Sequence, residues 1–118
     1  KNEISSNITP VITGNLIFTV SEDGYLLTIE KNKGNIIRVT DLLKNYKIKK
    51  RKDIKPVGFA IDDTTLYLTN SDGKMILADL SIGNIKTIEK VSGDFVSRPF
   101  IFNQNLFVIR NGSIVQYN

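Results

Sequence analysis

The chain has 118 residues, of which 41% are hydrophobic, and a formal net charge of +4. This length and composition predict one domain with a packed core and exclude an intrinsically disordered chain. The sequence contains no cysteine and no histidine, which excludes disulfides, thiolate metal sites and the most common general base. No apolar run approaches the ~18 residues that a membrane-spanning helix needs.

The first predicted unit begins near Ile8 and contains four strands. Their apolar, β-branched and aromatic residues favour strands over helices. The strands are expected at 10–13, 16–20, 25–30 and 35–40. Gly14-Asn15, Asp23-Gly24 and Gly34 lie between them, and these residue types are typical of the tight turns that join antiparallel strands.

A basic connection follows this unit over residues 41–56. It contains two acidic residues, Asp41 and Asp53, and seven basic ones, namely Lys44, Lys47, Lys49, Lys50, Arg51, Lys52 and Lys55. The net positive charge of the chain is therefore concentrated in this segment. The spacing of Leu42, Leu43 and Tyr46 is also compatible with one turn or a short helix within 41–47.

The second and third predicted units repeat the same order of strands and turns. In the second unit the strands are expected at 56–61, 65–69, 74–80 and 84–91. In the third they are expected at 99–102, 106–110 and 113–117, with no fourth strand. Several strands are nearly continuous in apolar residues, which is typical of strands buried on both faces.

Short motifs recur at a period in the forties. Asp23-Gly24 returns as Asp72-Gly73, and the triplet Gly34-Asn35-Ile36 returns as Gly83-Asn84-Ile85. The unit starts are marked by Pro10, Pro56 and Pro99. Such a period with several strands per repeat indicates β-propeller blades. We therefore predict an all-β fold of antiparallel four-stranded blades within one domain, 1–118. Blade 1 is expected at about 8–52, blade 2 at about 53–95 and a partial blade 3 at about 96–118.

These units resemble the repeats of the pyrroloquinoline-quinone-enzyme-type β-propeller superfamily. The matching pattern is Pro-Val, a strand, an Asp-Gly turn, a strand ending in an acidic residue, and then Gly-Asn-Ile. That superfamily includes quinone-dependent dehydrogenases and the non-catalytic propeller lipoprotein of the outer-membrane β-barrel assembly machinery. The resemblance implies the C-terminal blades of such a propeller. It favours the scaffold branch, because the recurring blade tryptophan of the enzymes is absent from this sequence.

The acidic residues of the turns do not predict catalysis. Asp23 and Asp72 precede glycines, and an Asp in this position normally caps its own turn. Serines have no histidine to activate them, and the glycines form no phosphate-binding pattern. We therefore expect no catalytic, cofactor-binding or metal-binding residues, and no cofactor.

The candidate partner-binding residues are basic. Lys49, Lys50, Arg51 and Lys52 form the densest part of the connection, and they indicate either an anionic partner or only a solvated loop. Lys55 and Arg98 each precede a proline that opens an inner strand, which would place them near one mouth of a propeller channel. Nucleic acid is a less favoured partner, because Tyr46 is the one aromatic residue in this basic segment.

The missing fourth strand of the third unit predicts an open edge and open apolar faces. Those surfaces would be covered by the remaining blades of a longer chain or by self-association. The predicted function is a non-catalytic binding or assembly scaffold of a bacterial envelope protein, periplasmic or otherwise in the cell envelope, with a protein partner. One alternative is a fragment of a quinone-dependent dehydrogenase. The other is a module that binds an anionic membrane, peripherally, or nucleic acid through 44–55.

Overall fold

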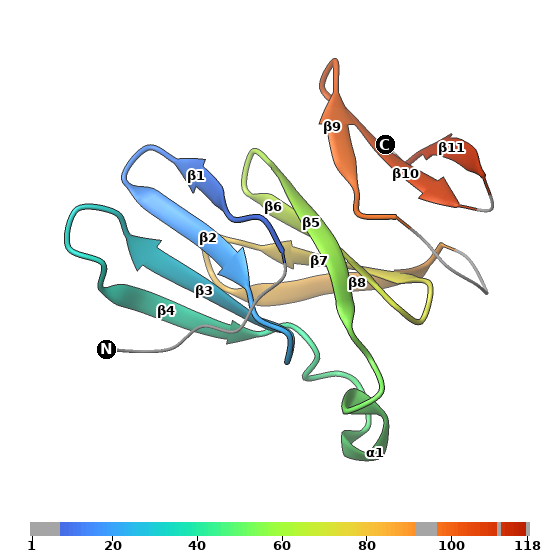
Figure 1. Ribbon diagram of the computed structural model, residues 1–118, viewed down its shortest axis with the longest axis horizontal. Coiled ribbons are helices and arrows are strands. Elements are labelled where there is room, and N and C mark those ends of the chain that lie inside the picture. Colours follow the sequence, from blue (N-terminus) through green and yellow to red (C-terminus); the bar gives the residue numbers. More distant parts are fainter. Residues whose placement is uncertain (1–7, 92–96, 111, 118) are drawn as a thin grey trace.

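Three antiparallel sheets follow one another in the computed structural model, which describes residues 8–91, 97–110 and 112–117. The first sheet contains β1 (Val11–Thr13), β2 (Leu16–Val20), β3 (Tyr25–Glu30) and β4 (Ile36–Asp41). The second sheet contains β5 (Pro56–Asp62), β6 (Thr65–Asn70), β7 (Lys74–Asp79) and β8 (Asn84–Lys90). The third contains β9 (Phe100–Phe102), β10 (Asn105–Arg110) and β11 (Ser113–Gln116). Figure 1 shows the sheets side by side, and within each sheet the strands that are neighbours in sequence pair with one another.

This architecture confirms the all-β prediction of two four-stranded blades and a partial third. Each strand lies where the sequence predicted it, with ends that differ by at most one residue. The Asp-Gly turns join the second and third strands of the first two sheets. Gly24 and Gly73 have φ angles of 85° and 81°, a conformation that glycine adopts without the steric cost of a side chain.

The larger core lies between the first and second sheets. Because side chains alternate across a strand, each sheet presents one set of residues to its neighbour and the opposite set to its other side. The buried residues of this core are Phe18, Val20, Leu26, Leu42, Leu43, Ile54, Phe59, Leu66, Leu68, Ile76 and Ala78. The second sheet thereby buries one whole face against the first.

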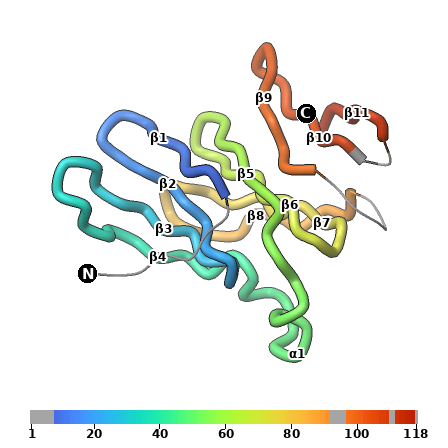
Figure 2. The backbone as a smooth tube through the Cα atoms, viewed as in Figure 1, coloured from blue at the N-terminus to red at the C-terminus, as the bar shows by residue number. Residues whose placement is uncertain are grey.

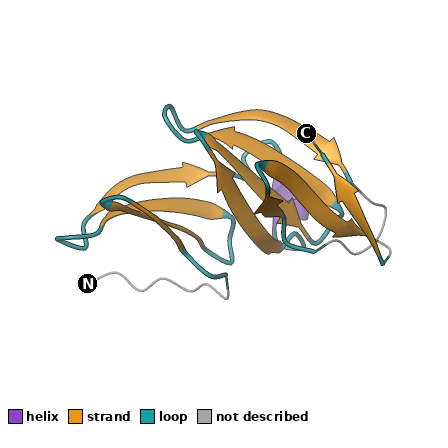
Figure 3. Ribbon diagram, turned by 90° about the horizontal axis from the view of Figure 1, so that it is seen from above, coloured by secondary structure: helices purple, strands orange, loops and turns teal. Residues whose placement is uncertain are grey.

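A smaller core joins the second and third sheets. Its buried residues are Met75, Val91, Leu106 and Val108. The middle sheet is therefore packed on both sides. Figure 3 shows the strands from above, with the helix lying behind a group of them. This burial of the middle sheet on both faces explains why its strand β7 has four consecutive apolar residues, from Met75 to Ala78.

The basic connection contains the turn, and not the short helix, that was predicted within 41–47. Residues 42–45 form this turn, and the helix α1 (Ile48–Arg51) begins only after it. The reason is that Leu42 and Leu43 are committed to the core, and the Leu42 amide donates to the carbonyl of Gly24 as a continuation of the first sheet. In Figure 2 the tube through α1 projects away from the three sheets.

Three features predicted from the sequence lie outside the described residues. These are the segment 1–7 that precedes the first unit, the boundary between the second and third units near 95–96, and Asn111 of the last turn. Among the described residues, no helix is long and apolar enough to cross a membrane.

Candidate functional site

Two adjoining clefts lie where the β2–β3 turn meets the basic connection. The first has a volume of about 240 Å³ and is lined by Glu22, Asp23, Tyr25, Arg51, Lys52 and Lys55. The second has a volume of about 220 Å³ and is lined by Ile8, Glu22, Lys55 and Pro56. Glu22 and Lys55 are common to both clefts. We call these two clefts together the connection site; it combines acidic residues of the turn with basic residues of the connection.

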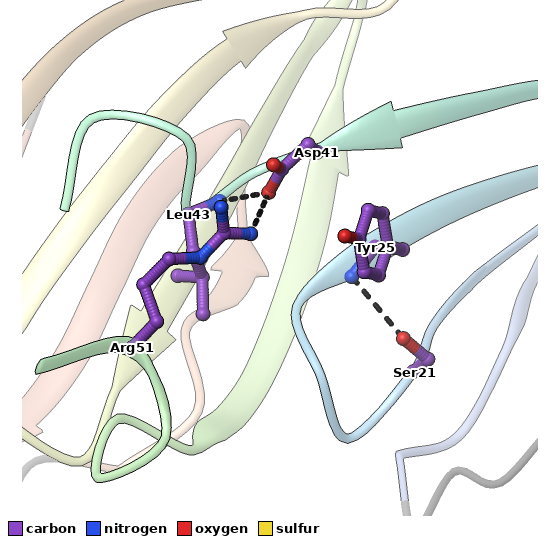
Figure 4. A network of polar contacts seen from close by, with 5 residues as sticks. All are labelled: Ser21, Tyr25, Asp41, Leu43 and Arg51. Carbon is purple, nitrogen blue, oxygen red and sulfur yellow. Dashed lines mark hydrogen bonds and ion pairs between the residues drawn. The ribbon is translucent and has the colours of Figure 1, made fainter. Parts of the chain in front are cut away.

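An ion pair fixes Arg51, one of the residues that line the connection site. The Arg51 guanidinium pairs with Asp41 at the end of β4, and Asp41 Oδ1 also accepts a hydrogen bond from the Leu43 amide at 3.1 Å. Figure 4 shows these side chains beside Tyr25, whose backbone amide donates to Ser21 Oγ. The hydrogen bond to Asp41 raises the pKa of Arg51 above its ordinary value, so this cation stays charged and tethered.

A second network anchors the connection to the neighbouring sheet. The Tyr46 hydroxyl donates to Asp72 Oδ2 at 2.8 Å, and Asn70 Nδ2 donates to the Tyr46 oxygen at 3.4 Å. Lys74 Nζ lies 5.7 Å from the centre of the Tyr46 ring, a cation–π distance. Burial and the bond to Asp72 raise the pKa of Tyr46, so the hydroxyl keeps its proton and its role as donor.

The predicted basic residues are only partly brought together. Arg51, Lys52 and Lys55 line the same cleft, whereas Lys49 and Lys50 lie on α1 outside its lining. All of them except the half-buried Arg51 are exposed. Two hydrogen bonds to Ser71 hold the backbone of Lys55. The Lys55 amide donates to Ser71 Oγ, and the Lys55 carbonyl accepts from the Ser71 amide.

Arg98 lies apart from this cleft, next to the inner strand of the second sheet. Its Cβ is 2.1 Å from the position that a Cβ would take at Gly58. The contact joins the inner strands β5 and β9 of successive sheets. Arg98 is exposed at this junction, so its guanidinium remains accessible to solvent.

The strand register shows that Lys55 and Arg98 are not equivalent positions, contrary to the prediction from the prolines. Val11 pairs with Phe18 in the first sheet, Ala60 with Tyr67 in the second and Phe100 with Phe107 in the third. Pro10 and Pro99 thus correspond to Phe59, because each precedes the first residue of such a pair. β5 is longer than β1 and β9 and has a register irregularity between Pro56 and Gly58. Pro56 therefore lies three residues before Phe59, the position that corresponds to Pro10 and Pro99.

Sequence reasoning missed the acidic side of the connection site and a clamp between the first two sheets. Asp23 was predicted only as a turn residue and Glu22 was not singled out, and nothing in the sequence indicated that this turn faces the connection. Arg38 Nη1 donates to the carbonyls of Leu80 and Ser81 at 3.0 and 3.3 Å, which ties β4 to the β7–β8 turn. Backbone acceptors leave no sequence pattern, so this role becomes visible only in the fold.

Titratable residues show no arrangement typical of a metal centre. Within the described ranges no three acidic residues gather closely enough to hold a metal ion. The turn aspartates contact their own turns: Asp72 Oδ1 accepts from the Lys74 amide and Asp79 Oδ1 from the Ser81 amide. The connection site thus combines exposed carboxylates of the β2–β3 turn with exposed cations of the connection.

Comparisons with known proteins establish the fold. No family model matches the sequence, and no curated protein matches it. The structure is similar to that of BamB from Moraxella catarrhalis, with a TM-score of 0.70 and 16% identity over 97% of this chain and 32% of that one. It is also similar to a quinohemoprotein alcohol dehydrogenase from Comamonas testosteroni, with a TM-score of 0.65 and 17% identity over 90% of this chain and 17% of that one.

A third similar structure is the β-propeller domain of Cps50 (Swd1) from Myceliophteria thermophila, with a TM-score of 0.65 and 10% identity over 80% of this chain and 31% of that one. The chain thus spans about a third or less of the length of these three structures. These structures include an alcohol dehydrogenase and a β-propeller domain, so the comparison does not assign a function to this chain. The chain has the fold of a segment of a β-propeller.

Proposed function

We propose that this chain is part of a non-catalytic binding or assembly scaffold, and that the basic connection docks an acidic protein surface. The observation that supports this most is the exposure of the cations of the connection. The side chains of Lys44, Lys47, Lys49, Lys50, Lys52 and Lys55 are all exposed, in a segment that projects from the sheets in Figure 1. A patch of one charge sign steers and orients a partner of the opposite sign.

The anchoring of the connection supports the same proposal. Leu42 and Leu43 are buried in the larger core, Tyr46 is bonded to Asp72, and Arg51 is paired with Asp41. The backbone that carries the lysines is therefore held at both ends of the segment. A pre-ordered loop loses less conformational entropy on binding than a free one, which favours a specific surface over a solvated linker.

The location and the extent of the scaffold follow from the sequence resemblance. We place the protein in the bacterial periplasm or elsewhere in the cell envelope, with blades at about 8–52, 53–95 and 96–118. A second candidate function uses the same exposed lysines to bind an anionic membrane peripherally or nucleic acid. Its support is the charge alone, because Tyr46, the aromatic residue of the segment, is engaged with Asp72.

Site-specific photocrosslinking in bacterial cells tests the proposed docking surface. A photoreactive residue is placed at the exposed Ile48 of α1. Lys49, Lys50 and Lys52 are then changed to Glu in one variant. In the control, the exposed Lys31, Lys33 and Lys90 are changed to Glu, which alters the net charge equally but lies outside the connection.

We expect one defined protein adduct that persists in the control variant and is lost in the connection variant. Equal adducts in both variants, or none with the unaltered chain, would contradict the proposal. Co-sedimentation with anionic vesicles and binding to duplex DNA, each at low and high salt, test the second candidate. Dehydrogenase activity on reconstitution with the quinone would instead favour the enzyme alternative.

A further inference from the structure

Another cleft lies between the first and second sheets, away from the connection site. Its volume is about 410 Å³, which exceeds that of either cleft of the connection site and is typical of small-molecule sites. We call it the inter-sheet cleft. Its walls are strands of the first sheet and the β5–β6 and β7–β8 turns of the second. A further sheet on the outer face of the first sheet would therefore not fill it.

The lining of the inter-sheet cleft is largely apolar. Its apolar side chains are those of Leu16, Phe18, Ile37 and Leu80. Phe18 is 6% exposed and belongs to the larger core, and the half-buried Leu16 and Leu80 pack against that core. Ile37 is 57% exposed. The cleft thus reaches from solvent to the edge of the larger core, and an apolar group that filled it would be removed from water.

Arg38 supplies the positive charge of the inter-sheet cleft. Phe18 pairs with Thr28 and Thr28 with Arg38, so these three side chains lie on the same face of the first sheet. That face is directed at the second sheet, where Arg38 Nη1 donates to the carbonyls of Leu80 and Ser81. These two bonds hold the guanidinium in one orientation, although the side chain is exposed.

The acceptors of Arg38 are neutral carbonyls, which do not compensate its charge. Within residues 8–91, 97–110 and 112–117, no carboxylate forms an ion pair with Arg38. The N–H groups of an arginine form a planar fork that binds both oxygens of a carboxylate. Asp63, in the β5–β6 turn, is the second charged residue of the lining. Its carboxylate disfavours a second negative charge in the same cleft.

We propose that the inter-sheet cleft binds a small organic acid with one carboxylate and an apolar body. The carboxylate pairs with Arg38, and the apolar body covers Leu16, Phe18 and Leu80. The fixed guanidinium selects an anionic head group, and the apolar lining selects the body. Asp63 selects against acids with two carboxylates.

Three probes with the same apolar chain and different head groups test this assignment. They are octanoate, the neutral octanol and the cationic octylamine. Each is titrated into the isotope-labelled chain, and the NMR shifts of the backbone amides give both Kd and the place of binding. We expect octanoate to shift the amides of Arg38, Leu80 and Ser81. It should bind at least about tenfold more tightly than octanol or octylamine, since hydrogen bonds to charged groups are the strong ones.

Two variants change the charge of the cleft and leave its buried contacts in place. Asp63→Asn removes the carboxylate of the lining and should tighten octanoate binding about two- to fivefold. Asparagine adopts the φ of 55° at this position as readily as aspartate does. Ile37→Glu adds a carboxylate at an exposed position of the lining and should weaken binding by a similar factor. Ile114→Glu is the control, because Ile114 is 65% exposed in the third sheet.

The NMR spectra verify that each variant is folded, and the control should bind octanoate as the unaltered chain does. Equal affinities for octanoate and octanol would overturn the proposal, as would amide shifts confined to residues outside the cleft. Absence of octanoate binding at millimolar concentration would do so too, and so would unchanged affinity in both cleft variants. In Figure 1, β5 runs from α1 at the bottom of the view to the β5–β6 turn at the top. The cleft and the connection therefore lie at opposite ends of β5, and neither result depends on the proposed docking function.

Discussion

Replacing Gly58 by alanine tests the contact between the inner strands of the second and third sheets. Gly58 is buried on β5, and its backbone lies outside the left-handed region, so alanine can adopt the conformation without backbone strain. The added Cβ would lie 2.1 Å from Arg98 Cβ and 3.2 Å from Arg98 Cα. Because these are backbone-proximal atoms, the third sheet itself must move to accept the methyl group.

The expected cost follows from overpacking. Inserting a methyl group into a close contact costs about 1–3 kcal/mol. Because alanine is less flexible than glycine in the unfolded chain, the substitution also stabilises the folded state by about 0.4–1 kcal/mol, which offsets part of this cost. We therefore expect the free energy of unfolding to fall for Gly58→Ala, with a loss of about 4 °C in Tm for each kcal/mol in a domain of this size.

A double-mutant cycle isolates this contact. Arg98→Gly removes the Cβ that the new methyl group would meet, so it should restore part of the stability lost in Gly58→Ala. Urea unfolding is measured for all four proteins at one fixed concentration, because association would otherwise shift the midpoints. Additive effects of the two substitutions, or a Gly58→Ala protein as stable as the parent, would refute the close approach of β5 and β9.

Three further predictions concern the connection and its anchors. Leu43→Ala removes a side chain that is 1% exposed in the larger core and should lower the free energy of unfolding in urea by about 2–5 kcal/mol; a neutral result would contradict the burial of this segment. Asp41→Asn keeps the acceptor for the Leu43 amide but loses the charge that pairs with Arg51. It should cost about 0.2–1 kcal/mol in low salt and less in 1 M salt, as thermal melts at both salt concentrations would show. Since folding raises the pKa of Tyr46, its stabilising effect is complete below the unfolded value of about 10 and is lost as pH rises above it. Tyr46→Phe should therefore flatten the alkaline decline of unfolding free energy, and identical declines in both proteins would disprove the bond to Asp72.

Local sequence was sufficient for the strands because their signals are local. Short runs of apolar, β-branched and aromatic residues and the positive φ of Gly24 and Gly73 set the hairpins without reference to the rest of the chain. Of the two structures predicted within 41–47, a turn or a short helix, the turn is the one that forms. Burial of Leu42 and Leu43 depends on a core that forms between two sheets, and this tertiary packing overrides a weak helical spacing.

The candidate site was predictable in its charge but not in its geometry. The basic residues of 44–55 are evident from composition, whereas the pairing of Arg51 with Asp41 and the nearness of Glu22 to Lys55 require the turn and the connection to meet in space. The expected equivalence of Lys55 and Arg98 rested on neighbouring prolines. Hydrogen-bond register corrected it: Pro56 lies farther from its hairpin turn than Pro10 and Pro99 do from theirs, so neighbouring prolines do not mark equivalent positions.

By itself, the sequence determined the propeller repeat, the number of strands in each unit and the concentration of positive charge in one connection. These depend on residue period and turn chemistry, which act over a few residues. The tertiary structure decided which face of each sheet is covered, since packing is a relation between sheets. It is this relation that forms the cleft beside Arg38 between the first two sheets and places the exposed cations on an anchored, projecting segment.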